Sequence, residues 1–124
     1  VKHLRINWTE GEKHFRNCLL DFNKANNVAQ WQWVAGCGAD AAPYFRIFNP
    51  ILQGEKFDKE GLYVKKWVPE LDKVPSKFVH KPWEMELKYQ QAIKTIIGKD
   101  YPQPIVIHEK ARASALEAFK TLKK

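Results

Sequence analysis

The chain has 124 residues, 44% of them hydrophobic and 28% charged, which is enough for one compact domain with an ordinary core. No apolar run is long enough to cross a bilayer, and no basic-then-apolar leader comes first, so we expect a cytoplasmic protein without a membrane partner. The net charge of +7 favours contact with a polyanion, such as DNA or an anionic membrane surface.

Two helices are predicted in the first third of the chain. Thr9 followed by Glu12 is a capping-box pattern, and apolar residues at helical spacing extend it to a helix over about 10–22. Asparagines and glycines bracket a second, shorter helix within 26–38. The prolines in 40–50 are too closely spaced for a helix or a paired strand, so this segment is predicted to be an ordered loop.

Two short helices are predicted next. Asn49 before Pro50 suits the cap and first turn of a helix that runs through about Lys56. Asp58 can cap another helix, and Pro69 limits its length.

The last third is predicted to hold two more helices. Prolines and mixed charges in 69–83 indicate a surface connection. Helical spacing of apolar residues then predicts a helix over 85–96, ended by Gly98, and a final amphipathic helix over 107–122. The fold class that follows is all-α, with helices joined by proline-rich loops.

Common catalytic and metal-binding patterns are missing from the sequence. Cys18 and Cys37 lack metal-ligand spacing, so we expect no metal and interpret both as buried small hydrophobes. The sequence has no glycine-rich phosphate loop and no Ser/His/Asp or Cys/His arrangement, so hydrolysis is not indicated. Its five tryptophans and seven phenylalanines suit either a packed core or contacts with a cofactor or with bases.

The most informative segments lie in the first half of the chain. They read Asp-Phe-Asn-Lys-Ala-Asn-Asn-Val-Ala-Gln-Trp-Gln-Trp-Val-Ala-Gly from Asp21 and Asp-Ala-Ala-Pro-Tyr-Phe-Arg-Ile-Phe-Asn-Pro from Asp40. Both resemble the cofactor and substrate region of class I cyclobutane-dimer photolyases. The resemblance continues through Gln-Gly-Glu-Lys-Phe-Asp at 53–58, Trp-Val-Pro-Glu-Leu at 67–71 and Tyr-Pro-Gln-Pro at 101–104. It implies that residues 1–124 form the C-terminal portion of the FAD-binding domain of the photolyase/cryptochrome family.

The resemblance assigns three residues to the flavin. An asparagine four residues before the Trp-Gln-Trp element lies beside the flavin N5 in this family, and Asn27 holds that position. Asp21 matches an acidic residue that supports the flavin. The family usually has a second aspartate where this chain has Asn23, so an amide replaces a charged acceptor in a position that tunes the flavin.

Three tryptophans also match positions of the family motif. Trp31 resembles the flavin-proximal member of an electron-transfer chain and Trp8 the middle member, while the outer member would lie upstream. Trp33 resembles the residue that packs against the flipped-out pyrimidine dimer, a role that suits a flat π-face. The alternative for Trp33 is a place in the core.

Two basic residues are candidates for contact with DNA. Arg46 can donate to phosphate oxygens near the dimer, or it can form an internal ion pair with Asp40. Lys56 is a further phosphate candidate, with simple solvation as the alternative.

The resemblance implies light-driven repair of cyclobutane pyrimidine dimers in DNA by electron transfer from reduced FAD, within a monomeric full-length protein. The antenna chromophore is not specified by this segment. The chain starts at Val1, without methionine, and lacks the family's antenna domain, so we expect a fragment that is inactive without the remainder of the photolyase. The alternatives are a cryptochrome-type blue-light photoreceptor and a non-enzymatic, basic helical remnant that binds DNA.

Overall fold

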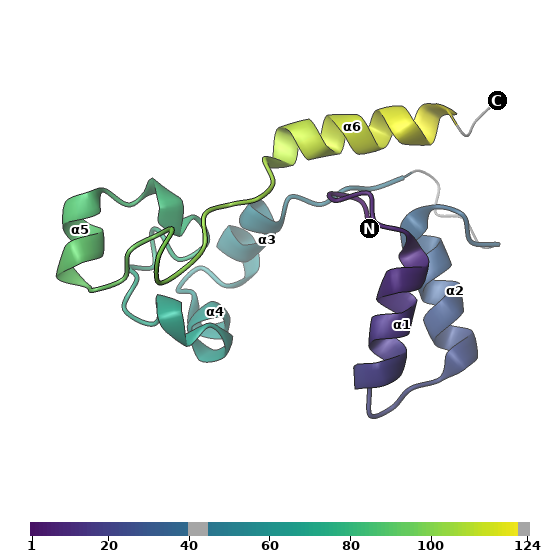
Figure 1. Ribbon diagram of the computed structural model, residues 1–124, viewed down its shortest axis with the longest axis horizontal. Helices are drawn as coiled ribbons and strands as arrows, with labels where there is room; N and C mark the ends of the chain where they lie inside the picture. The colour runs from purple at the N-terminus through teal and green to yellow at the C-terminus, as the bar shows by residue number, and fades with distance from the viewer. Residues whose placement is uncertain (40–44, 122–124) are drawn as a thin grey trace. The chain divides into compact units, whose positions relative to one another are not determined.

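A computed structural model describes residues 1–39 and 45–121, which form helices joined by loops (Figure 1). The described residues contain no strand, and their one β-type pairing is an isolated parallel bridge between Ile97 and Tyr101. The all-α prediction is confirmed. The chain divides into two compact units instead of the single unit suggested by its length: Val1–Ile47 with Val106–Lys124, called the first unit, and Phe48–Ile105, called the second unit.

Helix α1 (Trp8–Cys18) opens the first unit, and its start differs from the prediction. The N-cap is Asn7, whose Oδ1 accepts from the backbone N–H of Thr9 at 3.1 Å. Thr9 is therefore already helical, and Glu12 turns inward instead of closing a capping box. Because the chain becomes extended at Leu19, the helix also ends before the predicted residue 22.

Helix α2 (Lys24–Ala35) packs antiparallel against α1. Its N-cap is Asn23, and it ends at Gly36, which is left-handed at φ 80°. The N–H of Cys37 reaches the carbonyl of Gln32 at 3.0 Å, as in a Schellman motif.

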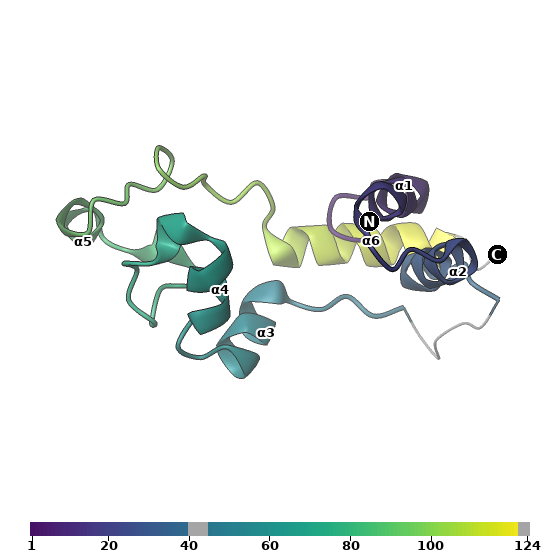
Figure 2. The ribbon, with the colours of Figure 1, turned by 90° about the horizontal axis from the view of Figure 1, so that it is seen from below.

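Helix α6 (His108–Thr121) completes the first unit. Figures 1 and 2 show it lying across the end of the pair at which α1 begins and α2 ends. The rings of Phe45 and Phe119 stack there, with centroids 4.4 Å apart and an interplanar angle of 9°.

Helix α3 (Pro50–Phe57) of the second unit begins as predicted, whereas the N-cap of α4 (Leu62–Trp67) is Gly61 instead of Asp58. For α3, Asn49 Oδ1 accepts from the N–H of Ile51 at 3.0 Å. For α4, the Asp58 carboxylate still accepts from two backbone N–H groups of the first turn at 3.1 and 3.2 Å.

The core of the second unit lies where a surface connection was predicted. The segment 69–83 carries the short 3-10 helix Pro69–Leu71 and the start of another, Pro82–Glu84. The buried core cluster comprises Leu71, Val74, Val79 and Met85. The prediction was wrong because prolines fix local backbone direction, whereas the apolar residues between them decide burial.

Helix α5 (Leu87–Ala92) is shorter than the predicted helix over 85–96. The helix ends at Ala92 with Ile93 as its C-cap, and the next residue, Lys94, is left-handed at φ 57°. Met85 packs in the core ahead of the helix, so its apolar character reports burial and not helical periodicity.

The two cysteines, Cys18 and Cys37, are exposed, which corrects the prediction that they are buried. No helix in the described ranges is both long and apolar enough to cross a membrane. Within those ranges, no three histidine, cysteine, aspartate or glutamate side chains converge as metal ligands.

Candidate functional site

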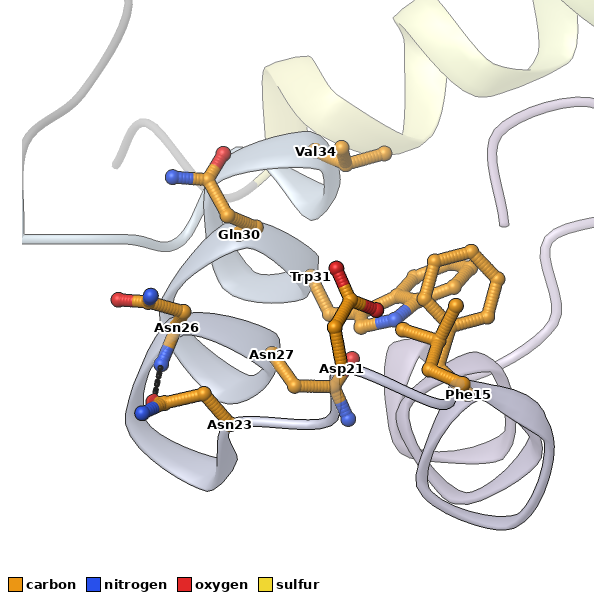
Figure 3. A pocket seen from close by; sticks show the side chains of 9 residues that line it. Phe15, Asp21, Asn23, Asn26, Asn27, Gln30, Trp31 and Val34 are labelled. Carbon is orange, nitrogen blue, oxygen red and sulfur yellow. Dashed lines mark hydrogen bonds between the residues drawn. The ribbon is translucent and has the colours of Figure 1, made fainter.

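A pocket of about 440 Å³ opens in the first unit, where α1, α2 and the segment joining them meet. Figure 3 shows amide side chains along one side and the rings of Trp31 and Phe15 on the other. The lining residues are Phe15, Leu19, Asp21, Asn23, Asn26, Asn27, Gln30, Trp31 and Val34. A pocket of this size, apolar on one side and polar on the other, is typical of a small-molecule site.

Four of the residues singled out in the sequence meet in this pocket. Asp21, Asn23, Asn27 and Trp31 all line it, although they come from two elements, the α1–α2 connection and α2. The other candidates, Trp8, Trp33, Arg46 and Lys56, do not.

Asn27 is the buried polar group of the pocket, with an exposed fraction of 8%. Its Nδ2 donates to the backbone oxygen of Glu12 at 2.9 Å and to the Glu12 Oε1 at 3.2 Å. Both partners are acceptors, so the amide orientation is fixed. Among the described residues none donates to the Asn27 Oδ1, which is therefore the amide atom able to accept from a ligand.

Glu12 is a supporting residue of the candidate site that sequence reasoning missed. Its side chain is buried, with an exposed fraction of 5%, and Arg16 one turn later contacts both carboxylate oxygens, at 2.9 and 2.6 Å. The carboxylate thus holds Asn27 while a guanidinium compensates its charge. The available signal was the Glu12/Arg16 spacing on one helix face, which the capping-box interpretation obscured.

Trp31 forms the wall of the pocket between the two helices. Its ring meets Phe15 edge-on, with centroids 5.0 Å apart and an interplanar angle of 77°. The benzo part of the indole lies directly over Gly11 of α1, where a Cβ atom would come within 2.3 Å of the ring.

Asn23 has a structural task besides lining the pocket. Its Oδ1 accepts from the backbone N–H of Asn26 at 3.0 Å and so caps α2 (Figure 3). An aspartate could accept the same bond. Asn23 therefore caps the helix as an aspartate would, but the rim of the pocket carries one negative charge fewer than it would with an aspartate.

Trp8 lies at the start of α1 and lines a different pocket of about 340 Å³ in the first unit, together with Lys2, Phe45 and Phe119. The Lys2 Nζ lies 4.6 Å from the centre of the Phe45 ring and donates to the backbone oxygen of Arg46. Burial lowers the pKa of Lys2 below its usual value.

The candidate DNA-contacting residues all lie at the surface. The Trp33 side chain on α2 has an exposed fraction of 44%, so it is not a core residue of the described structure. Arg46 is exposed in the first unit, and Asp40, its alternative ion-pair partner, lies outside the described residues. Lys56 is exposed on α3 of the second unit, with its Nζ 5.0 Å from the ring centre of Phe57.

Comparisons with known proteins identify the family of the chain. A family model described as the FAD binding domain of DNA photolyase matches residues 1–121. Over 124 residues the chain is 56% identical to a deoxyribodipyrimidine photo-lyase of Agrobacterium fabrum and 51% identical to that of Escherichia coli, and covers 26% and 25% of them. It thus spans about a quarter of the length of these relatives.

Solved structures of the same family superpose on most of the chain. A bacterial class III photolyase from Agrobacterium tumefaciens matches with a TM-score of 0.89 at 56% identity, over 98% of this chain and 25% of that one. A Synechocystis cryptochrome matches with a TM-score of 0.86 at 34% identity, over 94% of this chain and 24% of that one. The chain belongs to the FAD-binding domain of DNA photolyase family.

Proposed function

We propose that the chain is the C-terminal portion of the FAD-binding domain of a photolyase that repairs cyclobutane pyrimidine dimers in DNA with light. The observation that carries the proposal is the pocket in which a fixed amide, Asn27, and a wedged indole, Trp31, lie together. The names of the relatives support this activity for the parent protein. The motifs favour class I, while the solved relative at 56% identity is a class III photolyase, so the proposal extends to both classes.

The residues of the pocket fit a flavin ring. An isoalloxazine ring has an apolar benzenoid end and a hydrogen-bonding pyrimidine end, and the pocket offers Phe15, Leu19 and Val34 to the first and amides to the second. Its volume of about 440 Å³ suits the ring and not the whole dinucleotide. Because the sequence has no glycine-rich phosphate loop, we assign the phosphates to parts of the parent protein beyond this chain.

Reduced FAD, when bound, would supply one electron to the dimer on absorbing light and take it back after the cyclobutane ring opens. The residues of this chain would orient the ring and exclude water from one of its faces. Asn27 would present its Oδ1 to a ring N–H, because Glu12 holds the Nδ2 on the opposite side of the amide. Trp31 and Trp8 would carry electrons to the oxidised cofactor.

Contacts with damaged DNA would come from exposed side chains. Trp33 offers a π-face on which a flipped-out dimer could stack. Arg46 and Lys56 would contact phosphates, which position the duplex without reading its sequence. The parent protein would work as a monomer in the cytoplasm of a bacterial-type cell.

A cryptochrome-type photoreceptor is the second candidate, favoured by the match to the Synechocystis cryptochrome. Such a protein would bind the same cofactor and signal to protein partners. The Trp33 and Asn27 side chains favour repair, because each supplies a contact that repair would use. Dimer cleavage by the full-length protein under blue light discriminates between the two candidates.

The first test is an absorbance and fluorescence titration of the 124-residue chain with FAD, after circular dichroism has established helical folding. We expect saturable binding that Asn27→Ala abolishes and that Asn17→Ala, an exposed asparagine on α1 outside the pocket, leaves unchanged. The same variants in the full-length protein report retention of the flavin. A full-length protein that purifies without flavin and cleaves no dimers in light would refute the proposal.

A further inference from the structure

Gly11 is the point at which the indole of Trp31 meets α1. A Cβ atom at Gly11 would lie 2.3, 2.4 and 2.7 Å from the indole Cη2, Cζ3 and Cζ2 atoms, distances that real Cβ atoms do not show. Gly11 has no positive φ and lies inside a helix, where glycine is disfavoured relative to alanine. Helix geometry therefore does not explain the glycine, whereas the approach of the ring does.

Gly11 and its neighbours on the same face of α1 form a notch that holds the Trp31 ring. Trp8, Gly11 and Phe15 follow one another at a spacing of three and four residues, so they share one face of the helix. Phe15 contacts the indole of Trp31 edge-on from the C-terminal side. Trp31 therefore lies on the α1 face that also carries Trp8, one turn before Gly11, and forms the wall of the pocket.

We propose that Gly11 is a positioning residue for electron transfer through Trp31, an inference that rests on the proposed function. When FAD is bound, one electron would pass from the Trp31 indole to the light-excited, oxidised flavin, and one would pass from Trp8 to the oxidised Trp31. Two such one-electron events would be balanced by one added dithiol, which becomes a disulfide and releases two protons. The bare backbone at Gly11 sets the depth of the Trp31 ring in the notch and hence its distance to both of its electron-transfer partners.

A methyl group at Gly11 would push the indole away from α1. The neighbouring ring of Phe15 and the backbone of α2 restrict where the indole can move, so displacement would be towards the pocket and away from α1. The indole would then lie farther from Trp8 on α1, which would slow the step from Trp8 to Trp31. Repair starting from a flavin that has already been reduced chemically does not use Trp31 as a donor. The two reactions therefore separate a change in electron supply from a general loss of structure.

The test uses the FAD-loaded full-length protein with Gly11→Ala, with Trp31→Phe as reference and Gly54→Ala as matched control. Gly54 is also a helical glycine under a ring, since its Cβ would lie 2.4 Å from the His80 Nδ1, but it belongs to the second unit. We measure flavin photoreduction under blue light with dithiothreitol, and dimer cleavage after reduction with dithionite. Gly11→Ala should slow photoreduction about tenfold or more, given that displacements of about 1 Å can cost about a hundredfold in positioned reactions. Per bound flavin, Gly11→Ala should slow dimer cleavage much less than it slows photoreduction, and Gly54→Ala should change neither rate.

The outcomes separate the two proposals. If Trp31→Phe photoreduces normally, the assigned role of Trp31 fails. If Trp31→Phe is slow and Gly11→Ala is normal, the inference about Gly11 is overturned.

If the Gly11→Ala protein loses its flavin, a measurement of Tm still tests the inference. We compare the Tm change caused by Gly11→Ala in the original protein and in the Trp31→Phe background. The smaller phenyl ring should remove most of the loss, because the clash is with the indole. An equal loss of Tm in both backgrounds would show that Gly11 does not act through Trp31.

Discussion

The Asn27 amide is held from behind by Glu12, which accepts from the same Nδ2 through its backbone oxygen at 2.9 Å and through Oε1 at 3.2 Å. A residue inside α1 therefore determines which atom of a side chain on α2 faces the pocket. This contact joins the two helices at the level of the candidate flavin site. Arg16 contacts both carboxylate oxygens of Glu12 and so completes the contacts of this buried side chain.

Replacing Glu12 should weaken both folding and the site. Glu12→Ala leaves the Asn27 amide without its side-chain acceptor and Arg16 without its partner, so we expect a loss of about 1–3 kcal/mol in the free energy of unfolding. Urea unfolding followed by circular dichroism measures the loss. Glu10→Ala, at an exposed acid in the first turn of the same helix, is the control and should change stability much less. Equal stability of Glu12→Ala and the original chain would contradict the assigned role.

The cap of α2 should distinguish aspartate from alanine at position 23. Asn23→Ala removes the acceptor for the N–H of Asn26 and should cost about 1 kcal/mol. Asn23→Asp keeps that bond and places a negative charge at the start of a helix, so it should be neutral or slightly stabilising. Thermal unfolding of the three proteins checks the order. A destabilised Asn23→Asp variant would mean that the pocket, and not the cap, limits this position.

The stability of the first unit should fall in mild acid. The His3 Nε2 lies 2.9 Å from the His108 Nδ1, and desolvation, followed by the charge of His108 and that of the chain's amino group, lowers the pKa of His3 below its usual 6.5. The folded state thus favours neutral His3. The contribution of His3 to the free energy of unfolding is therefore fully present above pH 6.5 and is lost as the pH falls through the lowered pKa. Denaturant unfolding between about pH 8 and 5 measures this loss.

Two variants identify the source of the pH dependence. His3→Gln should flatten the stability profile, because the group whose proton uptake differs between the folded and unfolded states is gone. His14→Gln, at an exposed histidine on α1, is the matched control for the loss of one imidazole. A profile that His3→Gln does not alter would assign the dependence to other groups.

The segment 69–83 should behave as core. The Leu71 side chain has an exposed fraction of 2%, so Leu71→Ala should cost about 2–5 kcal/mol. The Leu62 side chain has an exposed fraction of 72%, and Leu62→Ala should change stability by less than about 0.5 kcal/mol. Chemical unfolding of both variants gives the comparison, and similar losses would place the core elsewhere.

Local signals predicted the features that local chemistry decides. Asn49 before Pro50 predicts a helix start from two neighbouring residues, and in the structure Asn49 is the N-cap of α3. The helix cap at Asn7 was missed because Thr9 and Glu12 offered a competing pattern that fitted equally well. The Glu12/Arg16 spacing was a sequence signal against the capping box, but what decides between the two patterns is the burial of Glu12 against Asn27 of the next helix.

The candidate site was predicted through its motif, while the supporting contacts were not. Asp21, Asn23, Asn27 and Trp31 lie close together in the sequence, and a helix with its preceding turn is enough to gather them. Gly11 and Glu12 reach the site only because α1 packs on α2, a tertiary contact that spacing within one helix does not encode.

Gly36 lies both at the end of α2 and against the Phe119 ring of α6. Its left-handed backbone closes α2, and a Cβ atom there would lie 2.9 Å from carbons of both Phe45 and Phe119. The stop of α2 and the docking of α6 therefore depend on the same few atoms, and neither is complete without the other. In hydrogen exchange, the amides of Gly36 and Cys37 should open together with those of α6, as one cooperative folding element formed from the two ends of the first unit.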